Sequence, residues 1–181
     1  MREHKIVVLG PMGAGKSTLV RAIGGGHHVD TDVRNTDTLS SKVATTVAMD
    51  YADLALPNGD RLRVFGTPGQ QRFDFIWPIL LEGASAAVIL LDATQRNPSD
   101  ALQPYLDALA EYADGLPVVV GLTRCDQVAS AAVEACSQNA RLRQRLLPVI
   151  PVDARCQDDV MLLMDVLMGE ADALSLLAVA S

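Results

Sequence analysis

The residues best suited to chemistry in this chain form a glycine-rich stretch near its start, GPMGAGKS, from Gly10 to Ser17. It fits the pattern G-x-x-x-x-G-K-S/T, with a strand-like run before it (Lys5–Leu9) and a helical pattern after it (Lys16–Ile23). Glycines let backbone N–H groups turn inward around phosphate oxygens, and the helix N-terminus adds partial positive charge. We therefore expect this segment to bind the phosphates of a nucleotide.

Individual residues of this phosphate loop have distinct expected roles. Lys16 should reach the β- and γ-phosphates, and the hydroxyl of Ser17 should be a ligand of Mg²⁺. The other expected nucleotide contacts in this segment are at Gly10, Gly13, Ala14, Gly15 and Thr18.

A second candidate site lies at the end of the apolar run Val118–Leu122, in the tetrapeptide Thr123-Arg124-Cys125-Asp126. A carboxylate at Asp126 can accept hydrogen bonds from both N1–H and the exocyclic N2–H of guanine. Adenine has neither donor, so the wrong base would leave polar groups unpaired. The residues alone leave open a simpler role for Asp126, as a helix cap after a strand.

The composition suits one nucleotide-binding domain, which we expect to span residues 1–181. Hydrophobic residues make up 49% of the chain and aromatic residues only 4%, so the core must be aliphatic, as in a sheet covered by helices on both faces. The net charge of −7 argues against a general nucleic-acid-binding surface, which needs many Lys and Arg residues.

The sequence also favours a cytoplasmic protein without direct insertion into a membrane. No uninterrupted apolar run is long enough to span a bilayer, and the ends carry no lipidation pattern. The three cysteines lack the spacing of metal ligands and are expected to be free thiols.

Short apolar runs alternate with longer helical patterns along the chain. Asn58-Gly59 lies between two strand-like runs and predicts a hairpin. The polar, aperiodic segment from His27 to Thr45 predicts a functional loop. Expected strands are Lys5–Leu9, Thr46–Leu56, Arg61–Phe65, Ala86–Leu91, Val118–Leu122 and Val149–Val152. Expected helices are Lys16–Ile23, Phe73–Leu81, a segment from Leu102 to Tyr112 or Ala113, Val133–Leu146 and Val160–Leu177. This order predicts an α/β fold with a mostly parallel six-stranded sheet, one antiparallel edge strand and helices on both faces.

The order of these features resembles that of the small GTPases, P-loop NTPases with a G-domain fold, and the resemblance covers nearly the whole chain. Three stretches carry it: GPMGAGKST, TTVAMDY and VFGTPGQQRFDFIWPILLEGASAAVILLDAT. The last stretch is similar to Arf-like proteins in its run from Gln70 to Trp77. The turn Pro68-Gly69-Gln70, with no Asp at Gly66, is more similar to the prokaryotic MglA-type GTPases and their conservon-associated relatives.

The resemblance implies a cycle between GTP- and GDP-bound forms with Mg²⁺ as cofactor. It makes Thr46 the residue that closes on Mg²⁺ and the γ-phosphate, with Thr45 as the alternative alignment. Gln70 would orient the attacking water next to Gly69 and Lys16. Asp50 and Tyr51 are expected only as part of the following strand.

The resemblance also implies the contacts to the base. Thr123 stands where the guanine motif usually has Asn, and its hydroxyl can still bridge to the phosphate loop. Arg124 stands in place of Lys, and its aliphatic stem can stack over a base. Near Asp153-Ala154-Arg155 we expect the last base contact, with the Ala154 N–H meeting guanine O6; a purely structural turn stays open there.

Two departures from the family pattern bear on catalysis. The Asp usually found at position 66 holds Mg²⁺ through a water molecule, so glycine there is expected to weaken magnesium affinity more than it impairs attack. Met12 stands where many small GTPases have glycine, and its bulk would slow hydrolysis or exclude a partner's arginine. GTP hydrolysis is therefore expected to be slow without a partner.

Family resemblance makes a roadblock-domain protein the expected regulator, in a bacterial polarity, motility or signalling system. The partner surface would comprise His27–Thr46 and Gly69–Leu80, and the chain would also engage an unidentified effector. Two alternatives stay open: a guanine-nucleotide-binding interaction platform with little hydrolysis, and a P-loop ATPase that uses Asp92 as its magnesium carboxylate.

Overall fold

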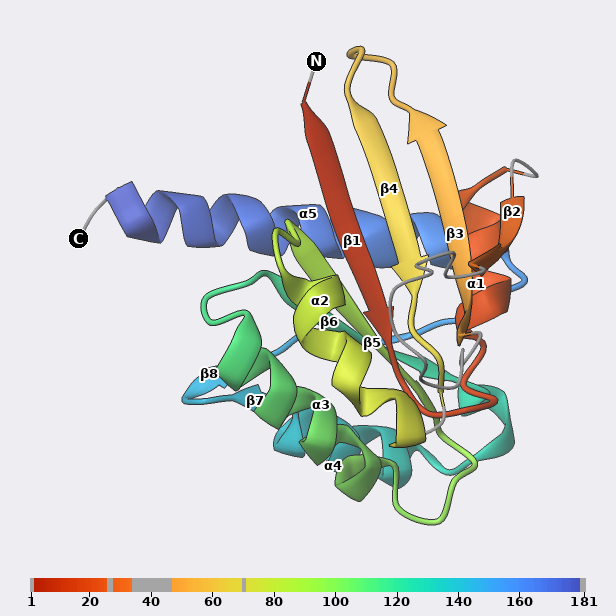
Figure 1. The fold of residues 1–181 in the computed structure, drawn as a ribbon. Helices are drawn as coiled ribbons and strands as arrows, with labels where there is room; N and C mark the ends of the chain where they lie inside the picture. Colours follow the sequence, from red (N-terminus) through yellow and green to blue (C-terminus); the bar gives the residue numbers. More distant parts are fainter. Residues whose placement is uncertain (1, 26–27, 34–46, 70, 180–181) are drawn as a thin grey trace.

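The computed structural model describes residues 2–25, 28–33, 47–69 and 71–179. These residues form a seven-stranded sheet in the order β2-β3-β4-β1-β5-β6-β9, with helices on both faces (Figure 1). Among the described strands of this sheet, β3 runs antiparallel to both of its neighbours, and the remaining adjacent strands pair in parallel.

The bounds of the elements are as follows. The strands of the large sheet are β1 (Glu3–Leu9), β2 (His28–Val33), β3 (Val47–Ala55), β4 (Arg61–Gly66), β5 (Ala86–Asp92), β6 (Val118–Thr123) and β9 (Val149–Pro151). A separate hairpin consists of β7 (Arg141–Leu142) and β8 (Arg145–Leu146). The helices are α1 (Lys16–Ile23), α2 (Trp77–Leu81), α3 (Pro98–Tyr112), α4 (Ser130–Asn139) and α5 (Gln157–Val179), and the 3₁₀ segments are η1 (Gln71–Ile76) and η2 (Cys125–Gln127).

Two apolar clusters hold the helices against the sheet. On one face, α1 and α5 cover the sheet; Figure 1 shows α5 crossing behind the strands. On the other face, α2, α3 and α4 pack against the same strands. Every residue of β5 and β6 is buried, because both faces of these strands are covered, and this explains their continuous apolar runs.

The predicted hairpin joins β3 to β4. Gly59 adopts a φ of 84°, which favours glycine, and the Leu56 N–H donates to the Asp60 carbonyl at 2.8 Å to close the turn. The pairing register that follows from this turn places Asp50 of β3 directly opposite Gly66 of β4. The hairpin thereby determines which side chains of β3 reach the phosphate loop.

The predicted fold class is confirmed, with two differences in its elements. The loop expected from His27 to Thr45 contains β2, so the sheet has seven strands rather than six, and the antiparallel strand β3 lies next to the edge rather than at it. The alternation of Val29, Thr31 and Val33 is a weak strand signal, and β3 supplies the backbone partners that complete it.

The helix expected over Val133–Leu146 ends at Asn139. Beyond it the chain turns back through the β7–β8 hairpin, with Arg143 at a φ of 55°. This reversal buries Ala140, Leu142 and Leu147 against the rest of the core, so tertiary packing prevails over the local helical spacing.

Two neighbouring leucines of α5 allow a test of this packing. Leu163 is fully buried between α5 and the sheet, whereas Leu162 is 53% exposed. We expect Leu163→Ala to lower the free energy of unfolding by about 2–5 kcal/mol, because it leaves a cavity. Leu162→Ala should change it by less than about 0.5 kcal/mol. Urea unfolding of the nucleotide-free protein measures both, and equal effects would contradict the placement of α5.

Candidate nucleotide-binding site

The phosphate loop runs from the end of β1 to the start of α1 and passes close beneath the neighbouring strand β5. Gly10 has a φ of 145°, and a Cβ added to it would lie 2.1 Å from the Leu90 carbonyl oxygen. Gly15, the N-cap of α1, has a φ of 101°. β5 leaves no room for a side chain at Gly10, and the positive φ favours glycine at Gly15.

Lys16 lies at the centre of this loop and is only 7% exposed. Its Nζ donates to the carbonyl oxygens of Gly10 and Pro11, each at 2.7 Å, and these two bonds hold the ammonium group inside the loop. Burial lowers the pKa of Lys16 to about 8, although the negative charge of Asp50 opposes this shift. A phosphate group at this position would supply the counter-charge that the buried lysine requires.

The turn after β4 packs directly on the phosphate loop. Thr67 is anchored to β1, since both its N–H and its Oγ1 donate to the Val8 carbonyl, at 2.9 and 3.1 Å. The Met12 N–H donates to the Gly69 carbonyl at 3.0 Å, and a Cβ at Gly69 would lie 2.8 Å from Lys16 Nζ. The structure therefore brings together Gly69 and Lys16, two of the three predicted catalytic residues.

The third predicted catalytic residue, Gln70, lies outside the described residues, as do both candidates for the switch threonine, Thr45 and Thr46. Their roles remain predictions from the sequence.

A cavity of about 550 Å³ adjoins the phosphate loop. Three segments far apart in the sequence meet around it: the start of α1, the end of β6 with η2, and the connection from β9 to α5. Its lining consists of Ala14, Gly15, Thr18, Thr123, Arg124, Cys125, Asp126, Gln127, Pro151, Val152, Asp153, Ala154, Arg155 and Asp159. All the residues predicted to contact the base therefore line one cavity.

Thr123 and Arg124 connect this cavity to the phosphate loop. The Thr123 hydroxyl lies 3.2 Å from the Ala14 carbonyl and 3.1 Å from that of Leu91, so the predicted bridge to the phosphate loop is present. Arg124 has a φ of 57°, and its guanidinium contacts the Gly13 carbonyl at 3.2 Å. These contacts fix the end of β6 against the phosphate loop.

Polar groups suited to recognising a base remain available in the cavity. Among the described residues, neither the Asp126 carboxylate nor the Ala154 N–H has a hydrogen-bond partner. Asp153, in contrast, is held in place: it pairs with Arg155 at 2.7 Å, and its N–H donates to Asp159 at 2.8 Å. Hydrogen bonds from Arg155 lower the pKa of Asp153 to about 2. Asp153 thus shapes the loop that presents Ala154.

Two members of the cavity, Gln127 and Asp159, lie outside the motifs that the sequence indicated. Cys125 and Arg155 lie within those motifs, but no role was predicted for them. Asp159 lines the cavity because α5 begins close to the end of β9, and no local sequence pattern predicts this arrangement.

Asp92 has a structural role at the end of β5. It is 6% exposed and accepts hydrogen bonds from the Thr94 N–H at 2.9 Å and the Thr94 hydroxyl at 2.6 Å, and it forms an ion pair with Arg124. Burial raises the pKa of Asp92, but the bonds from Thr94 and the charge of Arg124 outweigh this and hold the pKa below its usual value. These partners favour a structural role for Asp92, as a cap at the end of β5, over a role as a magnesium carboxylate.

A different carboxylate lies beside the predicted magnesium ligand. Ser17 donates its hydroxyl proton to Asp50 Oδ2 at 2.5 Å. Oxygen atoms are the ligands that Mg²⁺ prefers, so this pair fits the ion that a P-loop fold implies. The described residues contain no group of three His, Cys, Asp or Glu side chains that could hold a metal by themselves. Sequence analysis assigned Asp50 only to a strand and missed this contact.

The fold and this site define a P-loop nucleotide-binding protein with the topology of the small GTPases. The structure of translation elongation factor SelB from Methanococcus maripaludis, in complex with the GTP analogue GppNHp, superposes with a TM-score of 0.70. The superposition covers 95% of this chain and 34% of SelB, at 14% sequence identity, and it shows the fold.

The chain belongs to the family described as "Conserved hypothetical ATP binding protein", whose model matches residues 28–165. It is also 26% identical to Ras-related protein Rab-31 of Rattus norvegicus over 130 residues, which are 70% of this chain and 61% of Rab-31. Ras-related protein RabC of Dictyostelium discoideum is 23% identical over 177 residues, covering 94% of this chain and 84% of RabC. Uncharacterized protein MJ1339 of Methanocaldococcus jannaschii is 33% identical over 93 residues, or 51% of this chain and 53% of that protein.

No helix in the described part of the chain is both long enough and apolar enough to cross a bilayer.

The lowered pKa of Lys16 predicts a pH dependence of phosphate binding. The protonated lysine binds phosphate, so GDP affinity should be constant below about pH 8 and should fall above it, by up to about tenfold per pH unit. Fluorescence titrations with a labelled GDP between pH 6.5 and 10 measure this. The Lys16→Gln variant is the control: it should bind weakly throughout and show only the pH dependence that comes from ionisation of the guanine base. Parallel profiles for both proteins would contradict the prediction.

Proposed function

We propose that this protein is a small GTPase that alternates between GTP- and GDP-bound forms and hydrolyses GTP to GDP and phosphate. The observation that carries the proposal is the cavity beside the phosphate loop, into which Asp126 brings a carboxylate without a hydrogen-bond partner among the described residues. A carboxylate there pairs with N1–H and N2–H of guanine and has no equivalent donors on adenine. Similarity to two Ras-related proteins supports the same assignment.

Different residues of the site would bind the phosphates, position the attacking water and hold Mg²⁺ during hydrolysis. Lys16 and the N–H groups of Gly13 to Thr18 hold the phosphates and stabilise the charge that develops on their oxygens. Gln70 orients a water for in-line attack on the γ-phosphorus, whose bond to the bridging oxygen of GDP then breaks. Mg²⁺, held by Ser17 and Thr46, would neutralise charge on the β- and γ-phosphates.

Loss of the γ-phosphate would release the segments that contact it. Gly69 lies against Lys16 and Met12, and these contacts support a role in which its backbone would contact the γ-phosphate. Phe75 and Ile79, in η1 and α2 after this turn, are 62% and 65% exposed and extend an apolar surface from the turn. We propose that His27–Thr46 and Gly69–Leu80 bind a roadblock-domain regulator and an effector in the cytoplasm of a bacterium, as in the MglA-type GTPases.

The guanine assignment is tested by Asp126→Asn. We expect wild-type protein to bind GDP without competition from ADP, and the variant to lose GDP affinity by at least about a hundredfold, because two hydrogen bonds to a charged acceptor are lost. Xanthosine diphosphate should bind the variant better than the wild type, since the Asn amide can donate to the carbonyl at position 2 of xanthine. Asp114→Asn, at an exposed carboxylate, serves as the matched control. Equal affinity of the wild type for ADP and GDP would overturn the guanine assignment in favour of an adenine nucleotide.

Hydrolysis itself is tested under single-turnover conditions. We expect Gln70→Ala to slow phosphate release by about a hundredfold while GDP affinity stays unchanged, because an interaction made only in the transition state is removed. The adjacent Gln71→Ala is the matched control. If wild-type protein releases no phosphate above background, with or without a roadblock partner, the chain is a nucleotide-dependent interaction platform and not an enzyme.

A further inference from the structure

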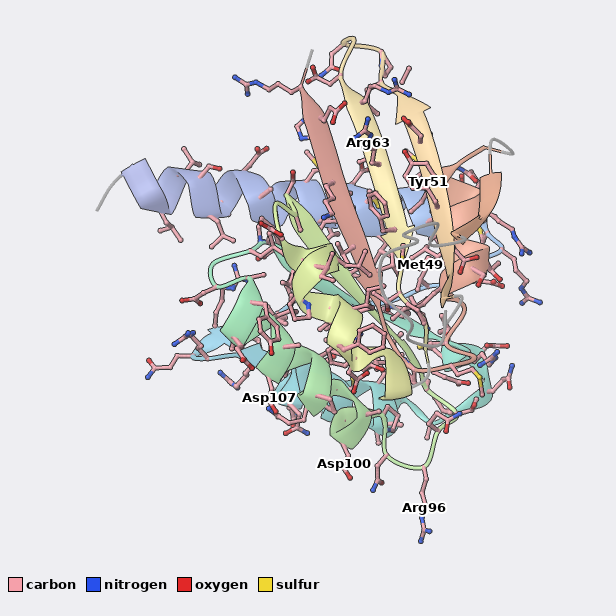
Figure 2. The ribbon with its side chains drawn as sticks, viewed as in Figure 1. Met49, Tyr51, Arg63, Arg96, Asp100 and Asp107 are labelled. Carbon is pink, nitrogen blue, oxygen red and sulfur yellow. The ribbon has the colours of Figure 1, made fainter. Side chains whose placement is uncertain are left out.

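The carboxylate that small GTPases usually carry at position 66 is absent, and a neighbouring strand brings another one to the same place. Asp50 of β3 is the cross-strand partner of Gly66 on β4. Alternation along β3 sends Met49 toward the face with α2 and α3, together with Phe65. Figure 2 labels Met49 and Tyr51 on β3, the residues before and after Asp50 in the sequence. Asp50 therefore points to the opposite face, where α1 begins.

The space around Gly66 is filled by this carboxylate. A Cβ built on Gly66 would lie 3.1 Å from the Asp50 Cβ, 3.4 Å from its Oδ2, and 3.3 Å from Cγ2 of Val20. Residue 66 is buried, so a side chain there would compete for space with Asp50 and Val20. Glycine at 66 and aspartate at 50 thus form one complementary pair.

The contact with Ser17 indicates what this carboxylate does. Because the Ser17 hydroxyl donates a hydrogen bond to Asp50 at 2.5 Å, the lone pairs of Oγ are left to face a cation. Asp50 also places its negative charge close enough to Lys16 to counteract the lowering of that lysine's pKa. The carboxylate lies beside both residues that a P-loop uses for Mg²⁺ and for phosphate.

We propose that Asp50 replaces the missing carboxylate at position 66, as the positioning residue that orients Ser17 toward Mg²⁺ and adds negative charge behind the ion. The proposal rests on the nucleotide binding proposed above. It also changes the expected consequence of Gly66: the magnesium requirement should be ordinary, because the carboxylate has been moved to β3 rather than lost.

The first test measures Mg²⁺ rather than turnover. Release of a fluorescent GDP is followed while free Mg²⁺ is titrated, and Mn²⁺ binding to the GDP complex is measured by electron paramagnetic resonance. We expect Asp50→Asn to raise the Mg²⁺ concentration that half-maximally slows GDP release by about 10–100-fold, and to weaken Mn²⁺ binding similarly. Asp53→Asn removes a carboxylate from the same strand that pairs instead with Arg61, and should leave both quantities unchanged.

A second readout separates this role from simple damage to the fold. With Mg²⁺ removed by EDTA, Asp50→Asn should bind GDP at least as tightly as the wild type, because a negative charge near the phosphates has been removed. A variant whose structure is merely loosened would bind GDP more weakly both with and without the metal. That second pattern, or an unchanged magnesium dependence, would overturn the proposal.

The exchange variant Asp50→Gly with Gly66→Asp provides a third test. It returns the carboxylate to β4 and removes the Asp50 side chain that obstructs it, so the magnesium dependence should recover toward that of the wild type. Asp50→Gly alone should not recover. If the wild type and all variants fail to bind GDP, the proposed function fails; if they bind GDP with equal magnesium dependence, only the role of Asp50 fails.

Discussion

The position of β1 between β4 and β5 is the constraint on which the rest of this molecule depends. β1 pairs in parallel with both neighbours, so the chain must leave the sheet at Gly10, directly beneath the Leu90 carbonyl, where any side chain would collide. The phosphate loop can follow this path only because residue 10 is glycine and has no side chain. β4 ends beside it and delivers Gly69 to the loop, and β6 delivers Thr123 and Asp126 from the other side.

The charged groups of this site are held by polar or oppositely charged neighbours, and two of them, Lys16 and Asp92, are buried. Lys16 donates hydrogen bonds to two carbonyls and lies near Asp50, and Asp50 accepts a hydrogen bond from Ser17. On the far side, Asp92 neutralises Arg124, which in turn contacts the phosphate loop at Gly13. The two carboxylates come from strands on opposite sides of β1 in the sheet, Asp50 from β3 and Asp92 from β5.

Much of the fold was predictable because its signals are local. The helix Lys16–Ile23 was predicted with its observed bounds, and the Asn58-Gly59 turn predicted its hairpin. The strand β2 was not predicted, because an edge strand with polar alternate positions is stable only when its partner is present. The hairpin β7–β8 was not predicted for a related reason. Its formation buries Leu142 and Leu147 in the core, and this burial outweighs the local helical spacing.

The sequence by itself determined the phosphate loop, its flanking elements and the set of residues predicted to contact a base, because glycine spacing and apolar runs are properties of short segments. The tertiary structure alone decided that those predicted contact residues line one cavity, that Asp92 forms an ion pair with Arg124, and that Asp50 faces Ser17. The last of these depends on strand register, in which a shift of one residue would turn Asp50 to the other face. Register is a relation between strands, and no short stretch such as VFGTPGQ contains it.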